Sequence, residues 1–172
     1  MGSESRRKIK LSSGFLLFSG KKLLVLQRAP ETGNGGTWGI PGGQRTNDEA
    51  SYAAALREAQ EEMGDMPAHA IIGQVKVERP GRVYELFAVR GRKRIKKEWQ
   101  PDLNEEHDNY KWVDIEWCQS HLEKLHPVLE MLISDPEQLR WLEQMFNAPR
   151  PEKLEGARRA TDYDVSANRP WA

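Results

Sequence analysis

Residues 43–65 read GQRTNDEASYAAALREAQEEMGD, and the pattern within this stretch indicates an amphipathic helix. Alanine dominates between Gly43 and Gly64, and no other glycine or any proline interrupts the run. Apolar residues recur at i, i+4, i+7 and i+11, a spacing that predicts one buried stripe along the helix. The stripe consists of Tyr52, Leu56, Ala59 and Met63.

Three glutamates gather on a different face of the same helix. Glu58, Glu61 and Glu62 stand at i, i+3 and i+4, so their carboxylates are neighbours. Two partly desolvated like charges ~4 Å apart repel by about 4 kcal/mol at an effective dielectric near 20. Such runs are usually solvated acidic faces. The other interpretation is a divalent cation site, because Mg²⁺ binds carboxylate and water oxygens and bridges to substrate phosphates.

The wider spacing Gly-x5-Glu-x7-Arg-Glu-x-x-Glu-Glu-x-Gly resembles the signature box of the Nudix hydrolase family. Every fixed position is filled, by Gly43, Glu49, Arg57, Glu58, Glu61, Glu62 and Gly64. The last position of the family box is usually aliphatic, whereas this chain has Asp65, followed by Met66. The departure concerns packing at the end of the box and leaves the carboxylates intact.

The resemblance implies an α/β/α sandwich with a mixed sheet, and it implies roles for the box residues. Glu58 and Glu62 are expected to bind Mg²⁺ or Mn²⁺, with Glu61 joining directly or through water. The carbonyl of Gly42 is a further metal ligand in several family members, although a simple turn is an equal interpretation. Glu49 and Arg57 are expected to form an ion pair along one side of the helix, and with Gly43 and Gly64 they brace the box.

An acidic residue outside the box often completes the metal site in this family, just before a late strand. Glu106 is the matching position, with Glu105 second, and either Glu58 or Glu106 is expected to act as general base. Glu61 is included with these two as a catalytic candidate. His107 is expected on the surface by default, with the orientation of a water or phosphate as the alternative; His121 and His126 are poorly spaced for a metal.

The implied reaction is hydrolysis of a phosphoanhydride bond in a nucleoside diphosphate linked to another group. Four substrate classes stay open: nucleoside triphosphates, dinucleoside polyphosphates, ADP-ribose and other nucleotide sugars. The alternative is a regulatory module of the same fold that binds a nucleotide or RNA without cleaving it. Candidate substrate-binding residues are Arg28, Trp38, Tyr84 and Trp99. The three aromatic side chains are candidates for base stacking, and packing in the core or on the surface is the more common role of such residues.

Length and composition predict one globular domain at residues 11–147, between a loose N-terminus (1–10) and a polar tail (148–172). Formal net charge is +0, which provides no general attraction to DNA or a membrane. The resemblance implies a small-molecule nucleotide as partner and, because family members are often dimers, keeps a homodimer as an open alternative. The single cysteine, Cys118, excludes an internal disulfide, predicts a buried inert thiol and favours the cytoplasm. The basic run at 91–97 is either a solvated loop or an electrostatic collar for polyphosphate.

Alternation and turn signals predict the remaining elements. Asp135 followed by Pro136 marks the start of a helix, as an N-cap with proline at the first helical position. The expected strands cover residues 11–18, 23–28, 71–77, 82–90 and 110–113, with a short extended piece at 37–40. The expected later helices cover residues 115–125, 127–133 and a segment from 136 onward.

Overall fold

A seven-stranded mixed sheet forms the centre of the computed structural model, which describes residues 8–46, 48–92 and 94–149. The main path of the sheet runs in the order β3-β2-β1-β6-β5, while β4 pairs with β1 and β7 pairs with β2. The β1–β6 pair is parallel and every other pair is antiparallel. The strands are β1 (Lys10–Ser19), β2 (Lys22–Arg28), β3 (Trp38–Gly39), β4 (Gly42–Gln44), β5 (His69–Arg79), β6 (Arg82–Gly91) and β7 (His107–Val113).

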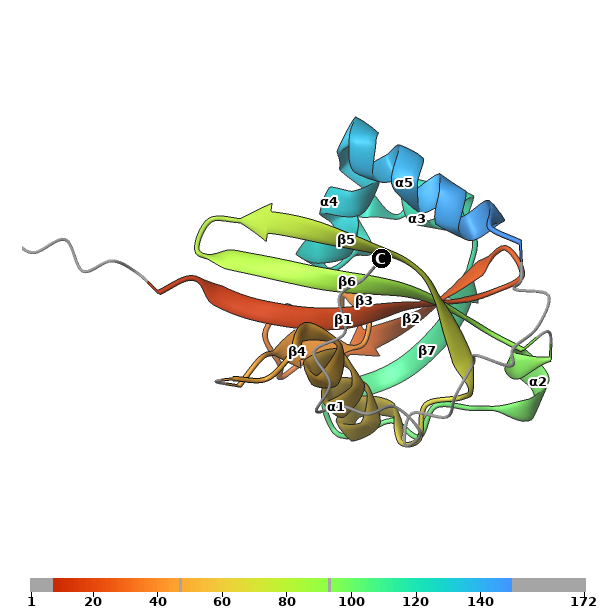
Figure 1. Cartoon of the computed structure of the whole chain (residues 1–172), viewed down its shortest axis with the longest axis horizontal. Coiled ribbons are helices and arrows are strands. Elements are labelled where there is room, and N and C mark those ends of the chain that lie inside the picture. Colours follow the sequence, from red (N-terminus) through yellow and green to blue (C-terminus); the bar gives the residue numbers. More distant parts are fainter. Residues whose placement is uncertain (1–7, 47, 93, 150–172) are drawn as a thin grey trace, which may run out of the picture.

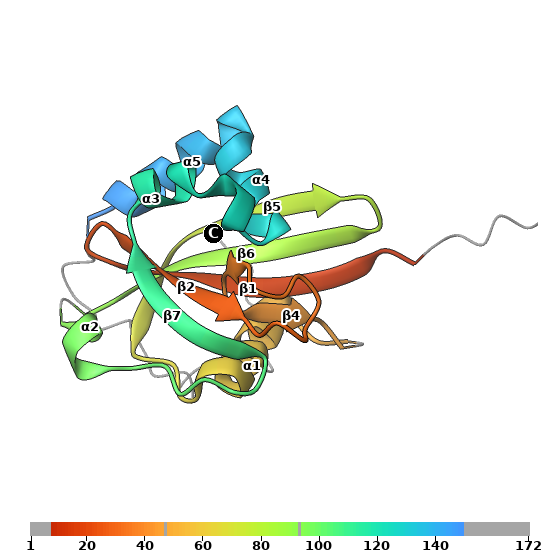
Figure 2. The same ribbon diagram turned by 180° about the vertical axis from the view of Figure 1, so that it is seen from behind.

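Helices cover both faces of this sheet, as Figures 1 and 2 show from opposite sides. The helix α1 (Ser51–Met63) lies on one face. The other face carries α3 (Ile115–Ser120), the 3-10 turn η1 (Leu122–Lys124), α4 (Pro127–Ser134) and α5 (Pro136–Asn147). The predicted α/β/α sandwich with a mixed sheet is confirmed.

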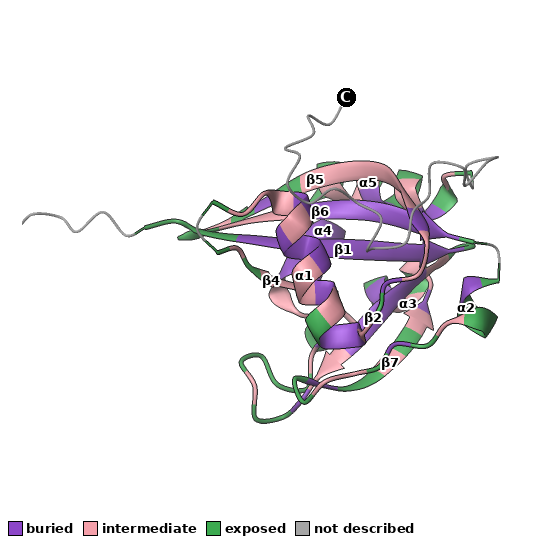
Figure 3. Ribbon diagram, turned by 60° about the horizontal axis from the view of Figure 1, so that its bottom comes forward, coloured by how far each residue is buried: buried purple, intermediate pink, exposed green. Residues whose placement is uncertain are grey.

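Side-chain alternation along β1 supplies both halves of the core. Phe15 and Leu17 pack toward α1, whereas Leu16 and Phe18 pack toward the layer of later helices. All four are fully buried. Figure 3 shows the same arrangement, with α1 lying across the buried central strands. The apolar run in this strand therefore reflects a sheet that is covered on both faces.

The predicted elements are found, with longer boundaries in most strands. Asp135 caps α5 as expected, because its Oδ2 accepts the Gln138 amide at 2.9 Å. The single helix expected at 115–125 is divided into α3 and η1. The short strand β4 and the helix α2 (Ile95–Glu98) were not predicted. Charged residues make up the rest of α2, but its single apolar residue, Ile95, is buried in the core on the α1 side of the sheet.

Arg90, near the end of β6, joins the sheet to the outer helix α5. Its guanidinium donates to the carbonyls of Met145 and Phe146 at 3.0 and 2.8 Å and to that of Gly20 at 2.7 Å. The residue is 5% exposed, and its guanidinium lies 5.7 Å from the centre of the Phe18 ring. A buried cation thus satisfies carbonyls at the C-terminal end of α5, where the helix dipole is negative.

The structure describes Cys118 and all the helices considered as membrane spans, whereas the predictions for the two ends of the chain fall on residues outside the described ranges. Cys118 is buried as expected, and burial raises the pKa of its thiol to about 12. Among the described residues, no helix has the length and apolar character needed to cross a membrane. The tail from residue 150 onward, including Trp171, and the N-terminal residues 1–7 fall outside the described ranges.

Candidate active site

The helix α1 carries two glutamates to the edge of a cavity because its opposite stripe is held against the sheet. Tyr52, Leu56, Ala59 and Met63 are all buried, as the spacing predicts. The helix ends at Gly64, whose φ of 75° favours glycine. Gly43 is needed for a different reason, since a Cβ at that position would overlap the Glu58 carboxylate. The backbone of β4 can therefore approach the α1 carboxylates closely.

Glu49 and Arg57 form the expected ion pair, but Glu49 precedes the helix. The helix α1 begins at Ser51, so the pair joins a loop to a helix rather than two turns of one helix. Arg57 Nε and Nη2 donate to the two Glu49 carboxylate oxygens at 2.8 and 3.0 Å. Arg57 also donates to Gln44 O at 3.1 Å and to Glu58 and Glu61 at 3.0 and 3.2 Å. One guanidinium thus connects β4, the loop and α1.

We expect Glu49→Gln to lower the free energy of unfolding by about 1 to 2 kcal/mol at pH 7, after allowing for the partly exposed Arg57. Hydrogen bonds from Arg57 lower the pKa of Glu49 from 4.5 to about 2. The stabilisation is therefore present above about pH 4.5 and is lost as the pH falls toward 2. Urea unfolding at pH 7 and at pH 3 measures the difference. Glu78→Gln, at an exposed position on β5, is the control. A pH-independent difference would contradict the assignment.

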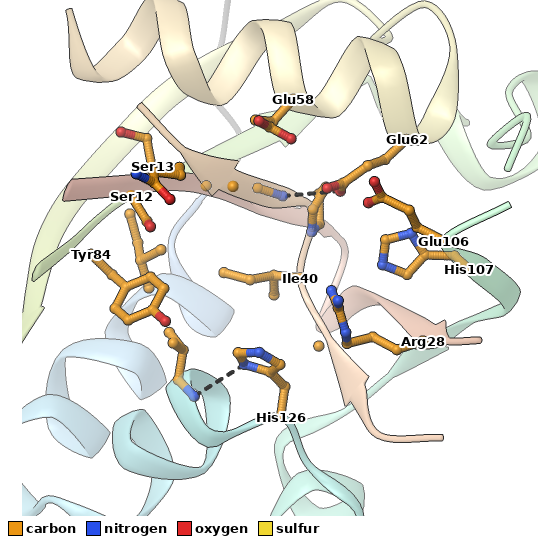
Figure 4. Close-up of a pocket in the computed structure, with 18 of the residues that line it drawn as sticks. Ser12, Ser13, Arg28, Ile40, Glu58, Glu62, Tyr84, Glu106, His107 and His126 are labelled. Carbon is orange, nitrogen blue, oxygen red and sulfur yellow. Dashed lines mark hydrogen bonds between the residues drawn. The ribbon is translucent and has the colours of Figure 1, made fainter. Parts of the chain in front are cut away.

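A cavity of about 300 Å³ lies between the sheet, α1 and the start of α4 (Figure 4). Glu58 and Glu62 reach it from α1, and Glu106 reaches it from the loop before β7. Glu62 is only 2% exposed, and one of its oxygens accepts the Gly42 amide proton at 3.1 Å. The structure therefore brings the predicted outside glutamate into the same cavity as two box glutamates.

These carboxylates destabilise one another in their ionised forms. Burial raises the pKa of Glu62 well above its usual range, and the charges of Glu58 and Glu106 raise it further. Burial also raises the pKa of Glu58, with Glu61 and Glu106 adding to the effect and Arg57 opposing it. A buried acid with two acidic neighbours and one backbone donor is typical of a site that binds a cation.

The donor set fits Mg²⁺ or Mn²⁺, since these ions prefer carboxylate, carbonyl and water oxygens. Across residues 8–46, 48–92 and 94–149, no three His, Cys, Asp or Glu side chains are clustered closely enough to hold an ion unaided. Mg²⁺ usually keeps several water ligands and needs only one or two carboxylates from the protein. The residues present are therefore compatible with such an ion.

Main-chain hydrogen bonds hold the Glu106 loop against the C-terminal end of α1. The amides of Asp102 and Asn104 donate to Met63 O and Glu62 O at 2.8 and 3.2 Å. Asn104 Oδ1 then accepts the Glu106 amide at 3.0 Å. The Glu106 carbonyl in turn accepts the Ala29 amide at 2.8 Å. The position of Glu106 thus follows from α1 and the end of β2 together.

The remaining candidates separate into two groups. Arg28 and Tyr84 line the cavity with the glutamates. Trp38 lies in the core and contacts Trp117 edge to face, and Trp99 lines a separate hollow near Ile95. Glu61 is not among the cavity-lining residues; its side chain is 56% exposed and pairs with Arg57.

Two histidines in the cavity were not assigned a role from the sequence. His107 is 5% exposed rather than on the surface, and its Nδ1 has no hydrogen-bond partner within the described part of the chain. Burial, with a contribution from the Arg28 charge, lowers the pKa of His107 to about 4. His126 also lines the cavity, and burial with nearby arginine charges lowers its pKa to about 4. Both rings are neutral at pH 7.

Comparisons with known proteins identify the family of this domain. The family model described as the NUDIX domain matches residues 8–135. An 8-oxo-dGTP diphosphatase from Proteus vulgaris is 28% identical over 101 residues, which cover 58% of this chain and 86% of that protein.

Solved structures share the fold. A Nudix hydrolase from M. smegmatis, RenU, aligns with a TM-score of 0.66 and 23% identity over 85% of this chain and 91% of that one. An Ap4A hydrolase from C. elegans aligns with a TM-score of 0.59 and 17% identity, over 78% of this chain and 98% of that one.

Proposed function

This chain belongs to the Nudix family, whose domain model matches residues 8–135, and we propose that it is a metal-dependent pyrophosphohydrolase. Its substrate is a nucleoside diphosphate linked to another group, and the bond broken is a phosphoanhydride. The observation that carries the proposal is the convergence of Glu58, Glu62 and Glu106 on one cavity. A non-catalytic domain has no need to keep three mutually repelling carboxylates around one cavity, one of them buried.

Mg²⁺ or Mn²⁺ would be held by Glu58, Glu62 and Glu106, some of them through water ligands, with the Gly42 carbonyl as a further ligand. When bound, the ion would neutralise charge on the phosphate oxygens and lower the pKa of the attacking water. Glu61 is exposed and already paired with Arg57, so its expected contribution would be made through water. The single buried carboxylate Glu62 is the residue for which a cation matters most.

Glu58 and Glu106 are the candidate general bases. A base must accept a proton during attack on phosphorus, and burial raises the pKa of Glu58, which makes its carboxylate a better acceptor. Arg57 holds one oxygen of Glu58 at 3.0 Å and so fixes the orientation of the carboxylate. Arg28 lines the same cavity and is available to bind a phosphate oxygen.

The substrate class is left to a direct assay of nucleoside triphosphates, dinucleoside polyphosphates, ADP-ribose and other nucleotide sugars. The relative named as an 8-oxo-dGTP diphosphatase supports adding an oxidised purine triphosphate to this set. Only with Mg²⁺ or Mn²⁺ present is the enzyme expected to cleave the substrate into two phosphorylated products, one of them a nucleotide. Chromatography of the products with and without EDTA gives the result.

Complete inactivity across this panel, together with tight nucleotide binding, would contradict the proposal. That outcome would favour the alternative of a module that binds nucleotide or RNA without cleaving it.

The single buried cysteine supports a reducing, cytoplasmic location as part of the same proposal.

A further inference from the structure

The cavity has two chemically different ends. Glu58, Glu62 and Glu106 form one end, and Tyr84 and His126 lie opposite them with Ile40 between (Figure 4). All carboxylates that line the cavity belong to the first end. The second end is therefore available for a part of the ligand that does not contact the carboxylates.

Arg82 and Tyr84, both on β6, supply hydrogen-bond donors at this second end. The Arg82 guanidinium lies 3.5 Å from the Tyr84 hydroxyl and forms no ion pair with any residue in the described ranges. Tyr84 lies beside Ser12 through the parallel β1–β6 pairing, and the Ser12 hydroxyl group also belongs to the cavity lining. A guanidinium without a carboxylate partner is a ready ligand for an anion.

His126 presents a further donor from the start of α4. Its Nδ1 accepts the Val128 amide at 3.3 Å, which places the proton of the neutral ring on Nε2. Asn34 Nδ2 lies 3.5 Å from Nε2 and is itself a donor, so it does not accept the Nε2 proton. His126 is also the N-cap of α4, so the positive end of that helix faces the same region.

Three arginine charges act on His126 at this end of the cavity. Beyond burial, the charges of Arg28, Arg79 and Arg82 all oppose protonation of the His126 ring. The same charges attract an anion. Apolar side chains of Ile40, Leu86 and Val128 complete the wall and exclude water from part of the site.

We propose that the end formed by Arg82, Tyr84 and His126 binds a second phosphate group, one that is not hydrolysed. This inference rests on the proposed function and narrows its substrate class. Preferred substrates are nucleoside diphosphate derivatives that carry a phosphomonoester at a distance from the scissile bond, either on the nucleoside or on the attached group. The carboxylate end takes the diphosphate, and the donor-rich end takes the phosphomonoester.

Matched ligand pairs that differ only in one phosphomonoester test the proposal directly. Suitable pairs are NADP with NAD and coenzyme A with dephospho-coenzyme A. Affinity is measured by calorimetry without divalent metal, and kcat/KM is measured with Mg²⁺ for any pair that is hydrolysed. At least one pair is expected to favour the phosphorylated member by about tenfold or more, as a charged hydrogen bond implies.

Arg82→Gln is expected to reduce this preference about tenfold, whereas Arg82→Lys keeps the charge and retains part of it. Arg140→Gln, at an exposed position on α5 outside the cavity, leaves the preference unchanged. Equal affinity for both members of every pair overturns the inference, as does a preference that survives in Arg82→Gln. Binding preference together with inactivity on these pairs and on the nucleotide panel leaves the inference standing and contradicts the proposed function; hydrolysis without preference does the reverse.

Discussion

Glu62→Gln is expected to lower the metal-dependent rate of hydrolysis by at least about 10³-fold, equivalent to about 4 kcal/mol in the activation barrier. Glutamine keeps the shape of the side chain and can still accept the Gly42 amide proton, which Glu62 accepts at 3.1 Å. The negative charge that attracts the cation is lost. Initial rates at saturating Mg²⁺ measure the effect, with Glu130→Gln on the exposed side of α4 as control. A rate within tenfold of the wild type would remove the box glutamate from the mechanism.

Stability provides a second measurement on the same variant that does not depend on turnover. Because the folded-state pKa of Glu62 is raised, its contribution to stability is present below the unfolded value of 4.5 and is lost as pH rises through the folded pKa. Without metal, the wild type should therefore lose stability relative to Glu62→Gln as pH increases. Mg²⁺ should restore the wild type and leave the variant almost unchanged. Equal Mg²⁺ effects on both proteins would contradict the metal role.

Arg90→Met is expected to lower the free energy of unfolding by about 3 kcal/mol. The variant keeps the length of the side chain but removes the guanidinium donor from the carbonyls of Gly20, Met145 and Phe146. Among the described residues, Met145 O then keeps only the Ala148 amide, at 3.4 Å. Burial lowers the pKa of Arg90, which shows that desolvation already opposes its charge. The free energy lost with the three charged hydrogen bonds should exceed the desolvation penalty that the substitution removes.

Urea unfolding at pH 7 measures the change, and hydrogen exchange of α5 amides locates it. Arg90→Lys should be intermediate, since an ammonium group cannot reach three carbonyls with the geometry of a guanidinium. Arg140→Met provides an exposed control on α5. Loss of stability without increased exchange in α5 would mean that Arg90 does not hold this helix.

Much of the site could be predicted because its key residues are close in sequence. The buried stripe of α1, the acidic cluster and the Glu49–Arg57 pair all follow from helical spacing or from the family box. The error about Glu49 concerns only the helix start, two residues later than the position of that glutamate. Local periodicity does not define where a helix begins when no side-chain cap is present, and Ala50 provides none.

Aromatic side chains show the limit of such reasoning. Trp38, Tyr84 and Trp99 were equivalent candidates for base stacking, yet only Tyr84 lines the main cavity. Trp38 instead packs against Trp117 in the core, with centroids 6.1 Å apart. Residue type and neighbouring turn residues do not distinguish an aromatic side chain that packs in the core from one that binds a ligand. Only the pairing of β6 with β1 places Tyr84 beside Ser12.

The sequence by itself determined a helix that gathers carboxylates opposite a buried stripe, because this depends on spacing within one element. The box at that helix identified the family, and the family resemblance implied the sandwich fold. The tertiary structure decided which other residues join them. Glu106 is held by Asn104 and the end of α1, while Arg82 and His126 arrive from a strand and a helix far apart in the chain. Their convergence results from strand pairing and loop closure, which leave no periodic signal in the sequence.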